Sequence, residues 1–376
     1  MLTTVSDLSL LKELLPDWRL PQVVPASKDG KQSTTPAQVQ EGSWAEPDSV
    51  RITKGKQEQI ANYLAAVQNL LDAQDAGRLR CYSSEDAPRV FAGLRRQNFD
   101  SNFFGFEIGR IEPLVVAPTE RWTEVERRNL QSYLTALLQE AAGHGFKQLS
   151  AYCEPSDFQL LQALSLCGFV PMDTTMRYEL NLGEWAQNKR DHSACRQSNY
   201  KTGSLTASDI RELRESDIDA LAAVTAQCFL DRARNINRFN SDPQFLETGK
   251  LPALYHTWFK NLARGELADQ VFVSQDSQGR PLGFLSVQLP SHKPSTLASG
   301  QCGAIPMMAV APEHQGRGIY ASLLKHAFDW FISQKIETVE LWTHISNTPN
   351  HRVWLKAGAT LTYTVHCLHC DLRQLQ

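Results

Sequence analysis

The sequence lacks any uninterrupted run of 18 apolar residues, the length that a membrane-spanning helix needs. Its first twenty residues carry acidic side chains and a Trp where a signal peptide has a basic start and an apolar stretch. Eight scattered cysteines do not reach the density of a secreted disulfide scaffold. The formal net charge of −3 indicates no large basic surface. We therefore expect a cytoplasmic protein with free thiols that binds neither nucleic acid nor membrane.

The 376 residues are too many for one comfortable core, so the length favours two domains. Residues 1–50, rich in Ser, Thr, Pro and Gln beyond residue 20, are expected to be a disordered leader. A leading helix and a first α/β domain are predicted over 51–182. The polar segment 183–205 has no periodicity and predicts a linker, and a second α/β domain follows over 206–376.

Both domains end in the same predicted order of strand, helix, strand, helix, strand. In the first these elements cover 106–116, 123–144, 148–153, 157–166 and 174–180. In the second they cover 303–310, 320–335, 338–343, 349–357 and 360–371. The fold class is therefore α/β (α+β), with two mixed, mostly antiparallel sheets flanked by helices, the first of them partial. The order indicates an internal duplication, whose sheets either pack or merge.

A glycine-rich turn after the predicted strand 303–310 is the most informative segment. The strand ends in Ala311-Pro312, and the chain passes through Gln315-Gly316-Arg317-Gly318 into a helix. Glycines let successive N–H groups point at one place, and the first turn of the helix adds unpaired donors and the positive end of its dipole. Glycine spacing alone is equally typical of an ordinary turn. The order of the surrounding elements favours a pyrophosphate site.

The stretch from Gly303 to Asp371 resembles the GNAT superfamily of N-acetyltransferases, whose Gln/Arg-x-x-Gly-x-Gly/Ala loop appears here as Gln315 to Tyr320. Tyr320 departs from that pattern, because it replaces Gly or Ala. The resemblance implies acetyl-CoA as co-substrate and no metal. It implies these cofactor-binding residues: Met308, Ala309, Val310, Gln315, Gly316, Arg317, Gly318, Ile319, Tyr320 and Asn347.

A tighter resemblance, to the TDP-fucosamine acetyltransferases, covers roughly Gln97 to Leu372. The segments that carry it are Asn98 to Gly105, Asn237 to Pro243 and Leu254 to Asn261. It implies a TDP-linked amino sugar as acceptor, with Arg238 and Phe239 binding the substrate. It also implies that the first half, which lacks its own glycine loop, does not bind coenzyme A. Arg238 is equally well explained as a surface ion pair.

The family mechanism implies direct attack of an amine on the thioester, with an oxyanion stabilised by a backbone N–H of Met308 or a neighbour. In the superfamily motif Asn-x-x-Ala-x-x-x-Tyr-x-x-x-Gly a Tyr often donates a proton to the thiolate. Here Asn347 and Gly358 match, while Asn350 replaces the Ala and Trp354 the Tyr. An indole N–H is no useful acid. Either the thiolate leaves unaided or another group donates.

The other candidate proton donors are Tyr320, His344, His351 and Tyr363. Tyr320 and His344 rank first, because they lie at the start of a helix and the end of a strand, where the two arms of the cofactor converge. The predicted catalytic residues are thus Tyr320, His344 and Asn347. A capping or solvated histidine remains the more common explanation for His344. Tyr320 alternatively packs beside the cofactor.

The sequence His366-Cys367-Leu368-His369-Cys370 contains zinc-ligand types, but strand alternation sends neighbours to opposite faces, which disfavours a metal site. We therefore expect an N-acyltransferase acting on a small amine, with a nucleotide-linked amino sugar as the first hypothesis. The alternatives are another amine, such as an amino acid, polyamine or antibiotic, and a non-catalytic acyl-CoA-binding protein. The sequence leaves open whether the chain forms a homodimer.

Overall fold

The computed structural model describes residues 3–4, 79–84, 90–116, 122–193, 210–233, 235–290 and 302–375. Most of the predicted leader, the predicted leading helix and residues 194–205 lie outside these ranges. Thr3–Thr4 forms a short strand, β1, against β2, so disorder is wrong for these two residues.

Besides β1, the first half of the chain contributes five strands and four α-helices to the described structure. The strands are β2 (Leu79–Ser84), β3 (Val90–Arg96), β4 (Ile108–Val116), β5 (Gln148–Cys153) and β6 (Val170–Asn181). The helices are α3 (Asn98–Phe104), α4 (Glu124–Gly143), α5 (Phe158–Leu166) and α6 (Leu182–Ser193). The predicted order from β4 to β6 is confirmed.

The second half contributes seven strands and five α-helices. The strands are β7 (Ile210–Glu212), β8 (Gln270–Gln275), β9 (Pro281–Val287), β10 (Gly303–Ala304), β11 (Met308–Val310), β12 (Thr338–His344) and β13 (Thr360–Asp371). The helices are α7 (Ile218–Leu230), α8 (Pro243–Glu247), α9 (Leu251–Ala263), α10 (Ile319–Ser333) and α11 (Thr348–Ala357).

Two mostly antiparallel sheets flanked by helices confirm the predicted fold class. A nine-stranded sheet has the order β1-β2-β3-β4-β5-β13-β6-β12-β10, and a four-stranded sheet has the order β11-β9-β8-β7. Among the strands of the described residues, only the pairs β4·β5 and β10·β12 are parallel. The larger sheet takes strands from both halves, so the two halves merge in one sheet. The predicted domain boundaries stay predictions.

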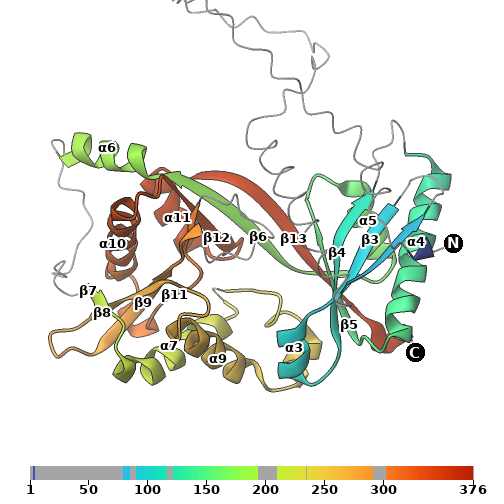
Figure 1. The fold of residues 1–376 in the computed structure, drawn as a ribbon, viewed down its shortest axis with the longest axis horizontal. Coiled ribbons are helices and arrows are strands. Elements are labelled where there is room, and N and C mark those ends of the chain that lie inside the picture. Colours follow the sequence, from blue (N-terminus) through green and yellow to red (C-terminus); the bar gives the residue numbers. More distant parts are fainter. Residues whose placement is uncertain are drawn as a thin grey trace, which may run out of the picture.

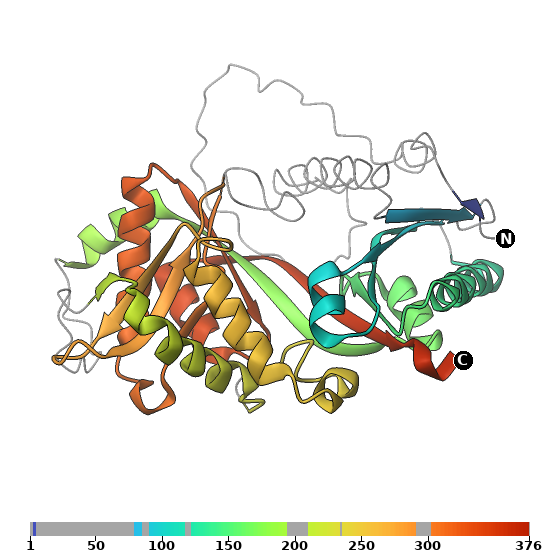
Figure 2. The same ribbon diagram turned by 60° about the horizontal axis from the view of Figure 1, so that its bottom comes forward.

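The merger is a reciprocal exchange of the last strand of each half (Figure 1). Strand β6 leaves the first half and pairs with β12 over seven register positions, from Thr338↔Asn181 to His344↔Thr175. Strand β13 leaves the second half and pairs with β5, from His366↔Cys153 to Asp371↔Gln148. The two exchanged strands pair with each other at the centre. Figure 2 shows β13 ending in the first half, near α4.

The hydrophobic cores follow the exchange. Leu368, Cys370 and Leu372, from the end of the chain, lie in the core beneath α4 and α5. Tyr178, Leu180 and Leu182 lie in the core formed with α10 and α11. Each half therefore completes the apolar core of the other.

Two segments differ from their predicted structure. The expected strand 303–310 is interrupted: β10 pairs with β12, and β11 pairs with β9. Residues 183–193, predicted as irregular linker, belong to α6. Asn181 Oδ1 accepts a hydrogen bond from Glu184 N at the start of this helix, and Trp185 packs on Phe328 with ring centroids 5.2 Å apart. One partly buried aromatic side chain, Trp185, thus packs a helix whose polar sequence gives no periodic signal.

None of the described helices is long and apolar enough to cross a membrane.

The exchange predicts that residues 206–376 do not fold alone. This fragment lacks β6 and the start of α6, and with them three side chains of its own core, each worth about 1.5–3 kcal/mol when buried. That loss is comparable with the about 5–15 kcal/mol that stabilises a typical domain. We expect no cooperative thermal transition by circular dichroism. Co-expression with residues 1–205 should restore a soluble complex, whereas a monomeric fragment with a sharp transition would contradict the prediction.

Candidate active site at the start of helix α10

The predicted strand 303–310 is interrupted between β10 and β11, and there β11 separates from β12. Gly303 of β10 lies beside Val339 of β12, while Met308 of β11 lies opposite Leu285 of β9. Between them, Met307 bonds Ser286 twice: Ser286 N donates to its carbonyl and its own N–H donates to Ser286 Oγ, both at 2.9 Å. Strand β11 is therefore an edge strand of the smaller sheet, and it diverges from β12.

The amides of Met308 and Val310 point toward this divergence. Ala311 N donates to Leu282 O at 2.9 Å, on the β9 side. Because backbone groups alternate in direction along a strand, the N–H groups of residues 308 and 310 point away from β9. The Val310 carbonyl also points away from β9, because it accepts a hydrogen bond from Gln315 Nε2 at 2.9 Å rather than from β9. The open edge thus offers N–H donors to a carbonyl group.

The glycine loop brings further donors to the same end of β11. Gly316 and Gly318 have φ of +75° and +83°, a region that only glycine adopts without strain. Helix α10 starts with Gly318 as its N-cap, without a side-chain cap and without an acidic residue in its first turn. Ser322 N makes the bond to Gly318 O, so the amides of residues 319–321 precede the first intrahelical bond. This helix start can bind an anion.

The corresponding helix of the first half has a closed start. Thr123 Oγ1 accepts from Glu126 N at 3.2 Å, and the Glu126 carboxylate accepts from Thr123 N at 2.7 Å. Glu124 adds a second negative charge to the first turn of α4. The side chains of this helix occupy its own N-terminal donors, and the nearby carboxylates repel a phosphate.

The predicted cofactor side chains mainly hold the loop. Gln315 binds the Val310 carbonyl, and Arg317 Nη2 donates to Glu313 O at 3.0 Å. Asn347 is the N-cap of α11, and its N–H donates to His344 O at 2.9 Å. Gln315 and Arg317 therefore stabilise the loop, and the loop itself presents backbone amides to a cofactor.

Tyr320 and Trp354 lie together between α10 and α11. The indole N–H of the fully buried Trp354 donates to the Tyr320 hydroxyl. Burial raises the pKa of Tyr320 strongly, and the bond from Trp354 offsets part of that rise. The Tyr320 hydroxyl keeps its own proton for donation elsewhere. The Trp that replaces the family Tyr therefore orients a Tyr from another helix.

His344, at the end of β12, contacts a carboxylate supplied by the first half of the chain. Its Nδ1 lies against Asp173 Oδ2 of β6, although the approach is too poorly aligned to be a hydrogen bond. The Asp173 side chain is 4% exposed and that of His344 is 26% exposed. The buried carboxylate therefore faces one nitrogen of this half-buried imidazole as a charge, and Nε2 is the other nitrogen through which a proton can be transferred.

His351 and Tyr363 are engaged in other contacts. His351 Nε2 donates to the carbonyls of His344 and Ile345 at 3.1 and 3.3 Å, so Nδ1 is the nitrogen that accepts from the Tyr178 hydroxyl at 2.9 Å. His351 therefore joins the end of β12 and the loop after it to Tyr178 of β6. Burial raises the pKa of Tyr363, whose ring lies near the Arg177 guanidinium.

Arg238 faces the first half from the segment between α7 and α8. Its Nη2 donates to Asp100 Oδ2 of α3 at 2.9 Å, and its guanidinium stacks 4.0 Å over the Phe239 ring. Nη1 is buried without a hydrogen-bond partner among the described residues. Phe239 is 2% exposed and packs against Phe245, so its ring is a fixed surface on which the Arg238 guanidinium stacks.

Sequence reasoning missed two residues of this site. Asp173 lies against His344 because β6 pairs with β12. No local sequence pattern predicts that pairing. Asn350 Nδ2 lies 3.8 Å from Met308 Sδ and 3.4 Å from Thr343 Oγ1, so it joins the ends of β11 and β12. Its place in the superfamily motif, where Ala is usual, was the available signal for Asn350.

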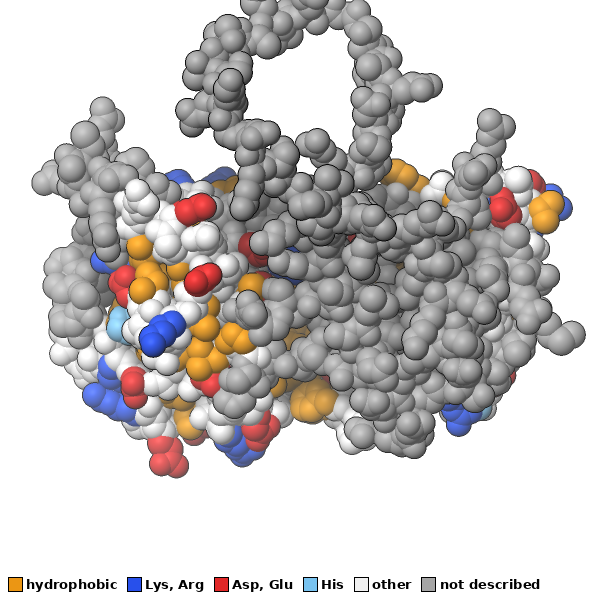
Figure 3. Space-filling view, turned by 45° about the horizontal axis from the view of Figure 1, so that its top comes forward, with side chains coloured by type: hydrophobic (Ala, Val, Ile, Leu, Met, Phe, Trp, Pro, Cys, Tyr) orange, Lys and Arg blue, Asp and Glu red, His pale blue; other side chains and the backbone are white. Residues whose placement is uncertain are grey.

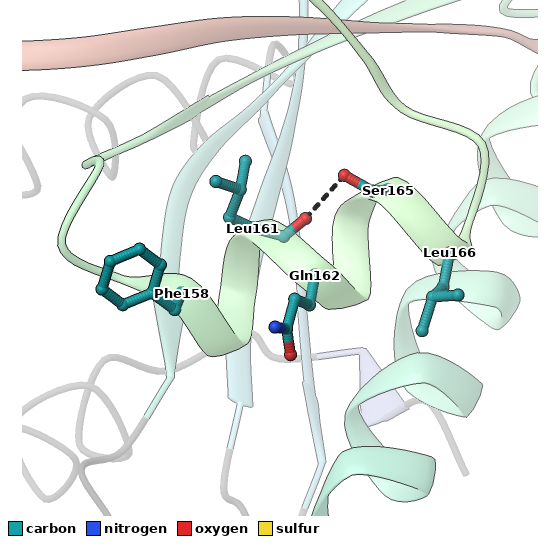
Figure 4. A pocket seen from close by; sticks show the side chains of 5 residues that line it. All are labelled: Phe158, Leu161, Gln162, Ser165 and Leu166. Carbon is teal, nitrogen blue, oxygen red and sulfur yellow. Dashed lines mark hydrogen bonds between the residues drawn. The ribbon is translucent and has the colours of Figure 1, made fainter.

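Other features of the described surface carry no comparable chemistry. A shallow depression on α5 is lined by one helix: Phe158, Leu161, Gln162, Ser165 and Leu166 (Figure 4). Ser165 Oγ donates there to Leu161 O, and no side chain is charged. Figure 3 shows acidic and basic side chains interspersed on the described part of one face. The described residues contain no group of three or more His, Cys, Asp or Glu arranged for a metal.

Residues 234–359, less than half of the chain, match the Acetyltransferase (GNAT) family. This match supports acyl transfer, the chemistry for which that family uses acetyl-CoA as co-substrate. No curated protein matches the chain.

Solved structures of low sequence identity are similar. A GCN5-related N-acetyltransferase from Sphaerobacter thermophilus aligns with a TM-score of 0.49 at 14% identity, covering 85% of this chain and 92% of that one. A tandem GNAT protein from the clavulanic acid biosynthesis pathway aligns with a TM-score of 0.42 at 15% identity, covering 78% and 83%. A GCN5-related glucosamine N-acetyltransferase region of a fungal β-N-acetylglucosaminidase aligns with a TM-score of 0.46 at 14% identity, covering 77% and 32%.

The bond between Trp354 and Tyr320 predicts a loss of stability in Trp354→Phe. The change leaves a buried phenol without its donor and a small void, which together should lower the free energy of unfolding by about 2–4 kcal/mol. Urea denaturation measures it. The matched change Trp342→Phe removes a half-buried indole bonded to Glu340 and should cost less. Equal losses in both variants would count against a special role for the Trp354 bond.

Proposed function

We propose that this protein transfers an acyl group from acyl-CoA, with acetyl-CoA as the natural donor, to the amine of a small acceptor. The observation that carries the proposal is the open start of α10 beside the diverging strands β11 and β12. Amides of the glycine loop suit the pyrophosphate, and those of Met308 and Val310 suit the carbonyl groups of the extended arm. One half of the chain has this arrangement, and the other has a capped helix in its place.

The proposed reaction uses the groups at the ends of β11 and β12 and at the start of α10. His344, held by Asp173, accepts a proton from the acceptor ammonium or from the attacking amine. The amine nitrogen then attacks the thioester carbonyl, whose oxygen gains negative charge beside the Met308 amide. The carbon–sulfur bond breaks, and the thiolate takes a proton from the Tyr320 hydroxyl or from water. The high pKa of Tyr320 makes it a weak acid, so the oxyanion donor is expected to contribute more.

The acceptor class that we favour is a nucleotide-linked amino sugar. The resemblance of the sequence to TDP-fucosamine acetyltransferases first suggested it. The free Nη1 of Arg238 supports it, because a buried guanidinium with one unused donor suits a phosphate. Arg238 lies between the halves, on the segment that also contacts the loop after β12 through Ile236 N and Ser346 Oγ. Other amines of similar size and non-catalytic binding remain outcomes of the tests below.

Calorimetric titration with acetyl-CoA tests the cofactor site. The double variant Gly316→Glu/Gly318→Glu places bulk and negative charge in the loop and adds backbone strain of about 1–2 kcal/mol per residue. We expect wild-type binding and at least a hundredfold weaker binding by the variant. Gly265→Glu is the matched control, since Gly265 has φ of +80° in a turn away from α10. If wild type does not bind, the glycine loop is only a turn; binding without turnover of any amine indicates a non-catalytic protein.

Asp173→Asn tests the role of the carboxylate behind His344. The change keeps the shape but removes the charge that orients the imidazole, so kcat should fall at least tenfold, while the Kd for acetyl-CoA stays within twofold. The matched control is Glu179→Gln on the same face of β6, whose carboxylate pairs with Arg177 at 3.0 Å. Unchanged kcat in Asp173→Asn would remove the His344 pair from the mechanism.

A further inference from the structure

A second group of chemically active side chains lies on β13 and its neighbouring strands. The segment between α7 and α8 contacts this group through Asp242. Cys367 and His369 are two residues apart on β13 and therefore share a face of the sheet. Tyr152 of β5 lies opposite Cys367 on one side, and Asp173 of β6 lies opposite it on the other. The acyl-transfer chemistry described above uses neither Cys367 nor His369.

Cys367, His369 and Asp242 form a linear chain of contacts. Cys367 Sγ lies 3.6 Å from His369 Nε2, and His369 Nδ1 lies 2.6 Å from Asp242 Oδ2. Asp242 is itself fixed, because its other oxygen accepts from Gln244 N at 2.8 Å at the start of α8. A thiol, an imidazole and an orienting carboxylate in this order are the arrangement that produces a nucleophilic thiolate.

The charges around Cys367 also favour its anionic form. Burial would raise the pKa of Cys367, but His369, Arg238 and Arg110 lower it. Burial would lower the pKa of His369, but Cys367 and Asp242 raise it. Tyr152 and Asp173 lie opposite Cys367 on the two neighbouring strands. The next charged groups outward contact these or the two Arg side chains: Asp100 against Arg238, Glu112 against Arg110, Arg95 against Glu112, and His344 against Asp173.

Two guanidinium nitrogens beside the cluster have no partner among the described residues: Arg238 Nη1 and Arg110 Nε. Both Arg side chains also have carboxylate contacts, Arg238 with Asp100 at 2.9 Å and Arg110 with Glu112 at 3.7 Å. Arg238 Nη1 is the donor proposed above for the acceptor phosphate, so Arg110 Nε is the unused buried donor that suits an added oxygen atom or a negative charge on sulfur.

Two other cysteines provide an internal comparison. Cys153 and Cys370, which face the apolar core on the opposite side of the sheet, are 2% and 3% exposed, and Cys367 is 2% exposed. Burial, together with nearby acids, raises the pKa of Cys153 and of Cys370 to about 12. The three thiols are thus equally buried and differ in electrostatic surroundings.

We propose that Cys367, with His369 and Asp242, is an oxidation site that reacts with hydroperoxides, hydrogen peroxide being the simplest. Its burial restricts the reactant to a small molecule. The thiolate sulfur attacks one peroxide oxygen, the sulfur–oxygen bond forms and the oxygen–oxygen bond breaks. Sulfur is oxidised to a sulfenic acid, and the peroxide is reduced. The departing hydroxide takes the proton of the His369 imidazolium and leaves as water.

The test measures oxidation of each cysteine in the full-length protein. The protein is treated with hydrogen peroxide at pH 7, and samples are quenched at intervals into denaturant with iodoacetamide. Mass spectrometry then gives the oxidised fraction, with fragmentation spectra separating Cys367 from Cys370, which share the tryptic peptide 357–373. We expect Cys367 to oxidise at least tenfold faster than Cys153 and Cys370, and dithiothreitol to reverse the first product.

The variant His369→Gln removes the imidazole and should slow oxidation of Cys367 at least tenfold, with the other two thiols unchanged. If the variant does not fold, all three thiols will react alike, and the wild-type ratio decides. A Cys367 that oxidises no faster than Cys370 in the wild-type protein overturns the proposal. So does a fast Cys367 whose rate is unchanged in a folded His369→Gln variant. Neither outcome depends on acyl transfer.

Discussion

The pairing of β6 with β13 is the interaction on which the rest of the structure depends. Each strand leaves its own half, so β12 receives its neighbour from the first half and β5 receives its neighbour from the second. The candidate site inherits this arrangement, because the carboxylate against His344 comes from β6. The Cys367 cluster inherits it as well, since Tyr152 and Asp173 flank β13 on its two sides. The two paired strands, β6 and β13, thus form the centre of the molecule, and the residues of both clusters lie on or beside them.

Local pattern was sufficient for most elements and for the glycine loop. Periodicity located β5 and β13 with their observed bounds, and the loop from Gln315 to Gly318 has the backbone conformation that its glycines require. The helices α3, α6 and α8 were missed, because short or polar helices carry little periodic signal. The strand exchange could not be read, since the partner of a strand depends on contacts between residues far apart in sequence. For that reason Asp173 was absent from the predicted site, although His344 was present.

The two halves show how similar elements acquire different roles. Helices α4 and α10 follow corresponding strands, yet Thr123 and Glu126 close the first while glycines leave the second open. The first half supplies charged groups instead: Asp173 against His344 and Asp100 against Arg238. In the proposed reaction one half would provide the donors for an anionic ligand, and the other would position side chains near the reacting atoms.

The exchange also sets the order in which the chain can fold during synthesis. Strand β5 is complete when residue 153 has been made, but the strand that covers its edge begins at Thr360. Until then, the backbone groups along that edge of β5 lack their final partner, and β6 lacks both of its neighbours. Exposed strand edges are sites of aggregation, and pairing across more than two hundred residues is slow. The fold is therefore expected to stay incomplete, and open to aggregation, until β13 has been synthesised and has paired with β5 and β6.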